Sequence, residues 1–218
     1  MELKAAIFDF DGTLADTVPV VCTAFQKALK QYTGRDFSDQ EIISRFGPSE
    51  TGIIRSIVPD CWEECYQLYL KTYEEEHHRC ESVFPGIMEL LEKLKSFGVR
   101  LGIVTGKGPD SNALTVKRLG LERLFDRIIP GSPNGGVKPQ AIKKLLEEWN
   151  CPPEAAVYVG DAVSDIEAAR EAKVGALAAA WSDHIDFDEL EAACPDAAFR
   201  TVDEMSAWFE QRLRNGGK

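Results

Sequence analysis

The segment of residues 7–14 (IFDFDGTL) constrains the fold more than any other part of the chain. A hydrophobic run at residues 5–8 leads directly into Asp9 and Asp11, and Gly12 follows at once. Side chains alternate between the two faces of a strand, so a strand continued through this segment would direct both aspartates the same way. Two adjacent carboxylates repel each other unless a cation lies between them. The pattern therefore predicts a buried strand that delivers a carboxylate pair to a hard, oxygen-binding metal such as magnesium, the alternative being an ordinary Asp-Gly turn.

Composition limits the classes of protein to which the chain can belong. Its 218 residues exceed one modest domain and are few for two full ones, which fits a core domain carrying a smaller insertion. Hydrophobic residues make up 44% of the chain, enough for a sizeable core. The 36 acidic residues exceed the 25 basic ones, for a net charge of -11. This charge repels phosphate backbones, so we expect no nucleic-acid partner, and an anionic substrate needs local cations or a metal.

The six cysteines show no tight paired spacing and indicate a reduced protein. Cys61, Cys65, His77, His78 and Cys80 could form a zinc site, but helical spacing with neighbouring aromatic residues favours ordinary packing. We recognise no signal peptide and no apolar run long enough to span a membrane, so we expect a cytoplasmic protein without a membrane partner.

Strand and helix patterns divide the chain into two parts. Helical spacing without a strand pattern extends over residues 16–80, and the remainder alternates between strands and helices. The strands are expected at residues 5–8, 99–105, 127–129, 155–159, 174–180 and 197–199. Such alternation is typical of an α/β fold whose parallel sheet is covered by helices on both faces.

Polar residues follow successive strands of this predicted sheet, where the ligand sites of such folds lie. The first strand leads to Asp9 and Asp11, and the second to Thr105, Gly106 and Lys107. A later strand leads to Asp161, with Asp165 four residues on, and Lys138 begins an intervening helix. Singly, each has an ordinary explanation as a helix cap, a surface lysine or a turn. Together, in order and in place, they predict one site.

The chemistry that suits this set is phosphoryl transfer. Asp9 is the candidate nucleophile and Asp11 the candidate general acid and base. Mg²⁺ would be held by Asp9, Asp161 and the main-chain carbonyl of Asp11, with Asp165 supporting this metal shell. The phosphoryl oxygens would be bound by Lys138, Thr105 and the Gly106 amide.

These motifs resemble those of the haloacid dehalogenase-like superfamily, most closely its phosphoglycolate phosphatase branch. The resemblance implies a Rossmann-like, doubly wound parallel sheet with an inserted all-helical cap. The core would comprise residues 1–15 and 83–218, and the cap residues 16–82. It further implies a magnesium-dependent phosphatase that acts on a small phosphate monoester, with phosphoglycolate favoured. Thr105-Gly106-Lys107 departs from the Thr-Asn-Lys usual in that branch, which bears on the substrate and not on the reaction class.

Several alternatives share part of the pattern. A phosphoglucomutase-like phosphotransferase or a pyrophosphatase would use the same core residues, and a phosphate-binding pseudoenzyme is the non-enzymatic alternative. Dehalogenases lack an acid at the position of Asp11, and no cap lysine marks a phosphonate hydrolase. Signalling receiver domains share the acidic cluster but lack the helical insertion.

Substrate specificity is expected from the cap and from one residue of the core. The loop at residues 45–50 lies between two predicted cap helices, with Gly47 at its turn. Arg45 and Arg55 are candidate cations for a substrate carboxylate or second phosphate, the alternative being ordinary surface residues. Lys107 is the further candidate, because it directly follows the phosphate-binding Thr105 and Gly106. We expect a monomer or a weak homodimer.

Overall fold

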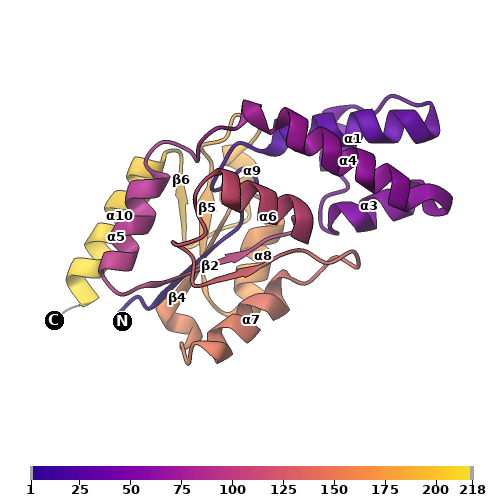
Figure 1. The fold of residues 1–218 in the computed structure, drawn as a ribbon. Helices are drawn as coiled ribbons and strands as arrows, with labels where there is room; N and C mark the ends of the chain where they lie inside the picture. The colour runs from indigo at the N-terminus through magenta and orange to yellow at the C-terminus, as the bar shows by residue number, and fades with distance from the viewer. Residues whose placement is uncertain (1, 217–218) are drawn as a thin grey trace.

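The computed structural model describes residues 2–216 and is built on a six-stranded parallel sheet (Figure 1). The strands are β1 (Ala5–Phe8), β2 (Arg100–Val104), β3 (Arg127–Ile129), β4 (Ala156–Gly160), β5 (Gly175–Ala179) and β6 (Ala197–Phe199). Their order is β3-β2-β1-β4-β5-β6, and every neighbouring pair is parallel. The predicted α/β class with a doubly wound parallel sheet is therefore confirmed.

Helices cover both faces of the sheet, and the side chains of β1 show why. Ala6 and Phe8 pack into one buried cluster with α5 and α10, whereas Ala5 and Ile7 pack into a second with α7 and α8. Figure 1 shows α5 and α10 together on one side, away from α7 and α8. The helices outside the insertion are α5 (Ile87–Ser96), α6 (Pro109–Arg118), α7 (Lys138–Glu148), α8 (Val163–Ala172), α9 (Phe187–Ala192) and α10 (Val202–Gly216).

The register of the three central strands brings their carboxyl ends to one level. Phe8 at the end of β1 pairs with Ile103 of β2 and with Val159 of β4. The residues that follow β1, β2 and β4 therefore emerge side by side at one edge of the sheet. This edge is where parallel α/β sheets bind ligands.

The insertion between β1 and α5 is helical throughout and forms a block to one side of the sheet (Figure 1). Its helices are α1 (Val18–Thr33), α2 (Asp39–Ile43), α3 (Glu50–Ile57) and α4 (Trp62–Glu76), with short 3₁₀ turns at Pro59–Cys61 and His77–Arg79. The rings of Phe25 in α1 and Tyr69 in α4 lie 4.6 Å apart between centroids, at the centre of the block. The boundaries of a separate cap domain at residues 16 and 82 remain a prediction.

β1 ends at Phe8, as expected, so Asp9 and Asp11 lie in the segment that follows the strand, and strand alternation does not orient them. The sequence pattern of residues 38–46 predicts a helix as far as Phe46, but α2 ends at Ile43, and the amide of Phe46 bonds to the carbonyl of Ile43, three residues back.

Two further expectations concern cysteines and membranes. All six cysteines are free thiols, and Cys65 and Cys80 are buried in the apolar core, as the packing interpretation predicts. Within residues 2–216, no helix combines the length and the apolarity that a membrane span requires.

Replacement of Phe25 by alanine should destabilise the protein, because the buried ring would leave a cavity against Tyr69. We expect a loss of about 3–5 kcal/mol in the free energy of unfolding. Phe97→Ala is the matched control, since Phe97 is 58% exposed, and should change the free energy by less than about 0.5 kcal/mol. Urea denaturation of both variants measures the difference, and equal losses would contradict this account of the helical block.

Candidate active site

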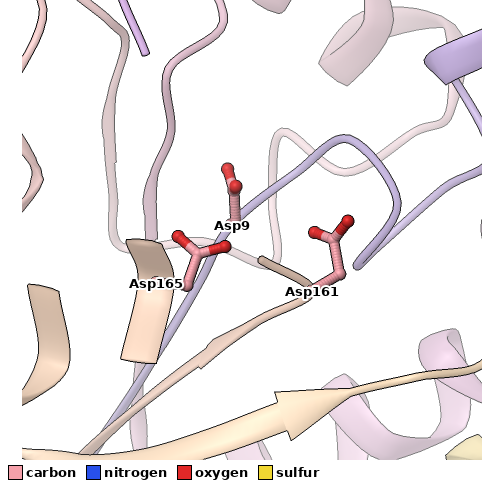
Figure 2. Close-up of side chains that lie close together, drawn as sticks. All are labelled: Asp9, Asp161 and Asp165. Atoms are coloured by element: carbon pink, nitrogen blue, oxygen red, sulfur yellow. The ribbon is translucent and has the colours of Figure 1, made fainter. Parts of the chain in front are cut away.

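Three carboxylates meet at the edge of the sheet where β1 and β4 end. Asp9 follows β1, Asp161 follows β4, and Asp165 lies in the first turn of α8. One ligand oxygen from each lies within 4.8 Å of the others. Figure 2 shows the three side chains gathered around a common space. We call these residues the acidic triad.

Burial and mutual repulsion make the acidic triad unfavourable as three bare anions. Burial raises the pKa of Asp161 well above its usual range, and the charges of Asp165 and Asp9 raise it further. Burial also raises the pKa of Asp9, although the ammonium of Lys138 opposes this effect. A cation would relieve the repulsion, and carboxylate oxygens are the ligands that Mg²⁺ prefers. The donor set therefore fits a divalent magnesium ion.

Lys138 supplies one positive charge to the acidic triad. Its Nζ lies 2.6 Å from Oδ2 of Asp9 and 2.5 Å from Oδ1 of Asp165. Burial disfavours the charged ammonium, but Asp165 and Asp9 outweigh this effect and raise the pKa of Lys138. Lys138, predicted from its place at the start of a helix, thus connects the residue that follows β1 with a residue of α8.

The remaining members of the triad are held by their neighbours. The hydroxyl of Thr13 donates to Oδ1 of Asp161 at 2.7 Å. Oδ2 of Asp165 accepts from the Ala162 amide at 3.1 Å, and the hydroxyl of Tyr158 lies 3.3 Å from its Oδ1. Asp165 is only 1% exposed, which agrees with the supporting role predicted for it. That role and the metal-binding role of Asp161 remain predictions.

Asp11 lies in different surroundings. Its Oδ1 accepts from Nζ of Lys107 at 2.9 Å and from the hydroxyl of Thr17. Its carboxylate is not part of the acidic triad, and the predicted metal contact through its main-chain carbonyl remains a prediction. The two carboxylates of the opening motif therefore contact different lysines, a distinction that their spacing alone did not reveal.

The loop after β2 is packed closely enough to leave little freedom to Thr105 and Gly106. Oγ1 of the buried Thr105 accepts from the Lys107 amide at 3.2 Å. A Cβ added to Gly131 would lie 2.0 Å from the Gly106 carbonyl oxygen, so the two loops meet without room for a side chain. This fixed backbone suits the phosphate-binding role predicted for Thr105 and Gly106.

The predicted specificity residues differ in their exposure to solvent and in their contacts. Arg45 and Gly47 are exposed, and Gly47 has a φ of +139°. The Gly47 carbonyl oxygen lies close to Gly106, so the loop at residues 45–50 reaches the loop after β2. Lys107 is buried and bound to Asp11, whereas Arg55 stacks on the ring of Trp62 at 3.8 Å.

Two contacts of the site carried no sequence signal. Thr17 in the turn before α1 donates to Asp11, and the buried Glu50 at the start of α3 accepts from the Gly108 amide at 2.6 Å. A glutamate that begins a helix looks like an ordinary exposed residue in the sequence. Only the tertiary structure shows that Glu50 reaches the loop after β2.

Comparison with known proteins places the chain in a family. The model of the haloacid dehalogenase-like hydrolases matches residues 6–179. The chain belongs to the haloacid dehalogenase-like hydrolases. A phosphoglycolate phosphatase of Synechococcus elongatus is 31% identical over 216 residues, covering 97% of this chain and 100% of that protein. The pyrophosphatase PpaX of Bacillus pumilus is 30% identical over 182 residues, covering 83% and 84% respectively.

Solved structures share this architecture. A protein of this family from Streptococcus pneumoniae superposes with a TM-score of 0.72 at 27% identity, covering 95% of this chain and 98% of that one. A hydrolase of Pseudomonas syringae gives a TM-score of 0.77 at 24% identity, with coverages of 95% and 98%. The resemblance stated from the motifs is thus confirmed. The relatives include one protein named as a phosphoglycolate phosphatase and one named as a pyrophosphatase.

Gly12→Ala should weaken Mg²⁺ binding, because a Cβ at this position would lie 2.3 Å from Oδ2 of Asp161. We expect a loss of about tenfold or more in affinity, as for other changes that displace a metal ligand. Gly98→Ala is the matched control: Gly98 has a φ of +78°, close to the +80° of Gly12, and open space around it. Calorimetric titration with Mg²⁺ measures both affinities. Equal affinities would show that Asp161 does not bind the metal.

Proposed function

We propose that the chain is a magnesium-dependent phosphatase that hydrolyses a small phosphate monoester through an aspartyl-phosphate intermediate. The observation that carries the proposal is the separation of two neighbouring carboxylates. Asp9 belongs to the acidic triad and pairs with Lys138, whereas Asp11 contacts Lys107 and Thr17. Different surroundings allow one carboxylate to act as a nucleophile and the other as an acid and base.

The first step would transfer the phosphoryl group to Asp9. A carboxylate oxygen of Asp9 forms a bond to phosphorus, and the bond between phosphorus and the ester oxygen breaks. Asp11 gives its proton to the departing alkoxide. Lys138 balances the charge of Asp9, and Thr105 and the Gly106 amide orient the phosphoryl oxygens.

The second step would release phosphate and restore the enzyme. Asp11, now ionised, removes a proton from a water molecule, whose oxygen forms a bond to phosphorus as the bond to Asp9 breaks. Asp9, Asp161 and the main-chain carbonyl of Asp11 would hold Mg²⁺, with Asp165 in support. A bound divalent cation neutralises charge on the phosphoryl oxygens.

Asp9→Asn should abolish turnover, because the amide keeps the shape of the carboxylate but is not nucleophilic. We expect kcat to fall by at least about a thousandfold. The control is Asp36→Asn, since the side chain of Asp36 is 81% exposed and lies in the helical block. Phosphate release from an aryl phosphate measures both variants. Activity retained by Asp9→Asn would rule out the covalent mechanism.

The proposed substrate is a small anionic ester of the phosphoglycolate type, with pyrophosphate as the second candidate. Relatives named as phosphoglycolate phosphatase and as pyrophosphatase support these two. Both carry negative charge beyond the transferred phosphoryl group, whereas the protein has a net charge of -11. A local cation near the entrance would therefore favour either of them. Arg45, exposed beside the loop that reaches Gly106, is the proposed residue, with Gly47 shaping the turn.

Arg45→Ala should lower kcat/KM for the better of phosphoglycolate and pyrophosphate by about tenfold, the effect of losing one charge-assisted hydrogen bond. The same change should leave hydrolysis of an aryl phosphate nearly unaltered, because the phosphoryl contacts remain. Arg55→Ala is the control, since Arg55 stacks on Trp62. Equal losses on all substrates would show that Arg45 serves the fold or the phosphoryl site. Steady-state kinetics with Mg²⁺ distinguish these outcomes.

A further inference from the structure

Lys107 is a buried cation that the phosphoryl-transfer steps above leave without a role. Its side chain is completely buried, and its Nζ lies 2.9 Å from Oδ1 of Asp11. The face of the Tyr73 ring lies 4.5 Å from the same nitrogen, between centroid and atom. The ammonium is therefore committed to groups of the protein and not exposed to a ligand.

The contacts of Asp11 show what this ammonium does. Oδ1 of Asp11 accepts two hydrogen bonds, one from Lys107 and one from the hydroxyl of Thr17. Two donors on one oxygen fix the carboxylate plane and occupy that oxygen. The proton exchanged with substrate and water is then carried by Oδ2. A general acid must lie within hydrogen-bond reach of the leaving oxygen, so its orientation governs the rate.

The backbone of Lys107 is held on three sides. Its amide donates to Oγ1 of Thr105 at 3.2 Å, and its carbonyl accepts from the Gly131 amide at 2.7 Å. The next amide, that of Gly108, donates to Oε2 of Glu50 at 2.6 Å. Lys107 thus has a fixed starting point from which its side chain reaches Asp11.

Glu50 makes the helical block part of this arrangement. It is buried at the start of α3, and its Oε1 accepts from the hydroxyl of Ser111 and lies 3.4 Å from that of Tyr69. A Cβ on Gly108 would lie 2.2 Å from Oε2 of Glu50, so a side chain there would displace the Glu50 carboxylate. Both oxygens of this buried carboxylate accept hydrogen bonds, so Glu50 fixes the segment after β2 to the start of α3.

We propose that Lys107 is a positioning residue that holds the acid and base Asp11, and that Glu50 fixes the segment carrying Lys107. This inference rests on the proposed function and deepens it. Glu50, Thr17 and Tyr73 belong to the helical insertion, whereas Asp11 and Lys107 belong to the core. Docking of the insertion on the core therefore completes the acid and base, besides covering the site.

Lys107→Met tests the proposal, because methionine matches the aliphatic part of the lysine side chain in length but lacks the ammonium. We expect kcat for alkyl phosphates, whose leaving groups need a proton, to fall by about a hundredfold, with KM changed less than about threefold. The fall should be equal for an anionic and a neutral alkyl ester. An aryl phosphate should show a rapid burst of phenolate followed by slow turnover, since only its second step needs Asp11. Asp11→Asn gives the upper limit of these effects.

Glu50→Gln is the second variant and decides the matter if Lys107→Met does not fold. Glutamine offers one acceptor oxygen where Gly108 and Ser111 require two, so the Lys107 segment should shift. The same kinetic pattern is expected at about tenfold. Glu74→Gln is the matched control: Glu74 also links the insertion to α6, through Arg118 at 3.6 Å, but is exposed. Circular dichroism and thermal melting confirm folding.

Two results would overturn the proposal. One is a rise in KM for phosphoglycolate alone, with kcat on a neutral alkyl phosphate unchanged, which would make Lys107 a substrate-binding residue. The other is unchanged kinetics in Lys107→Met and Glu50→Gln while Asp9→Asn is inactive. That result would reject the positioning role and leave the proposed phosphatase intact. Activity in Asp9→Asn would instead reject the phosphatase mechanism itself.

Discussion

The ion pairs that join Lys138 to Asp9 and Asp165 are the contacts on which the site depends. Three carboxylates share a small buried space, and their repulsion must be offset for the carboxyl ends of β1 and β4 to lie together. Lys138 reaches this space from the start of α7, so one side chain connects three separate parts of the chain. The geometry of the sheet brings the three carboxylates together, and the positive charge of Lys138 offsets part of their repulsion.

The sheet and the position of the acidic triad could be predicted because they follow from local patterns. The apolar run of residues 5–8 is buried on both sides, as the interior strand of a parallel sheet requires. The carboxyl ends of parallel strands share an edge of the sheet, so Asp9, Asp161 and Thr105, which follow three of the strands, were expected at that edge. Lys138 was found by the same reasoning, from a loop at that edge. These positions depend on topology, which the alternation of strands and helices specifies.

The partners of Asp11 could not be predicted, because they depend on how the helical insertion docks. Strand alternation failed at Asp11, since β1 ends at Phe8 and a turn directs the next side chains. Lys107 follows the phosphate-binding loop in sequence, which favoured a substrate contact, yet the structure places it on Asp11. Glu50 is separated from Gly108 by 58 positions in the sequence. No local pattern reports a contact of that kind, because it is set by tertiary packing.

Two aspartates separated by one residue can perform opposite tasks only if their environments differ, and two lysines provide that difference here. Lys138 bonds Asp9 within a crowded set of carboxylates, where a further divalent cation is favoured. Lys107 bonds Asp11 against the Tyr73 ring, beside the insertion. In the proposed mechanism, the first environment addresses the phosphoryl group, which every substrate of the class shares. The second, which residues of the insertion complete, addresses the leaving group, in which substrates differ. Under that mechanism, changes in the insertion alter leaving-group chemistry without disturbing phosphoryl binding.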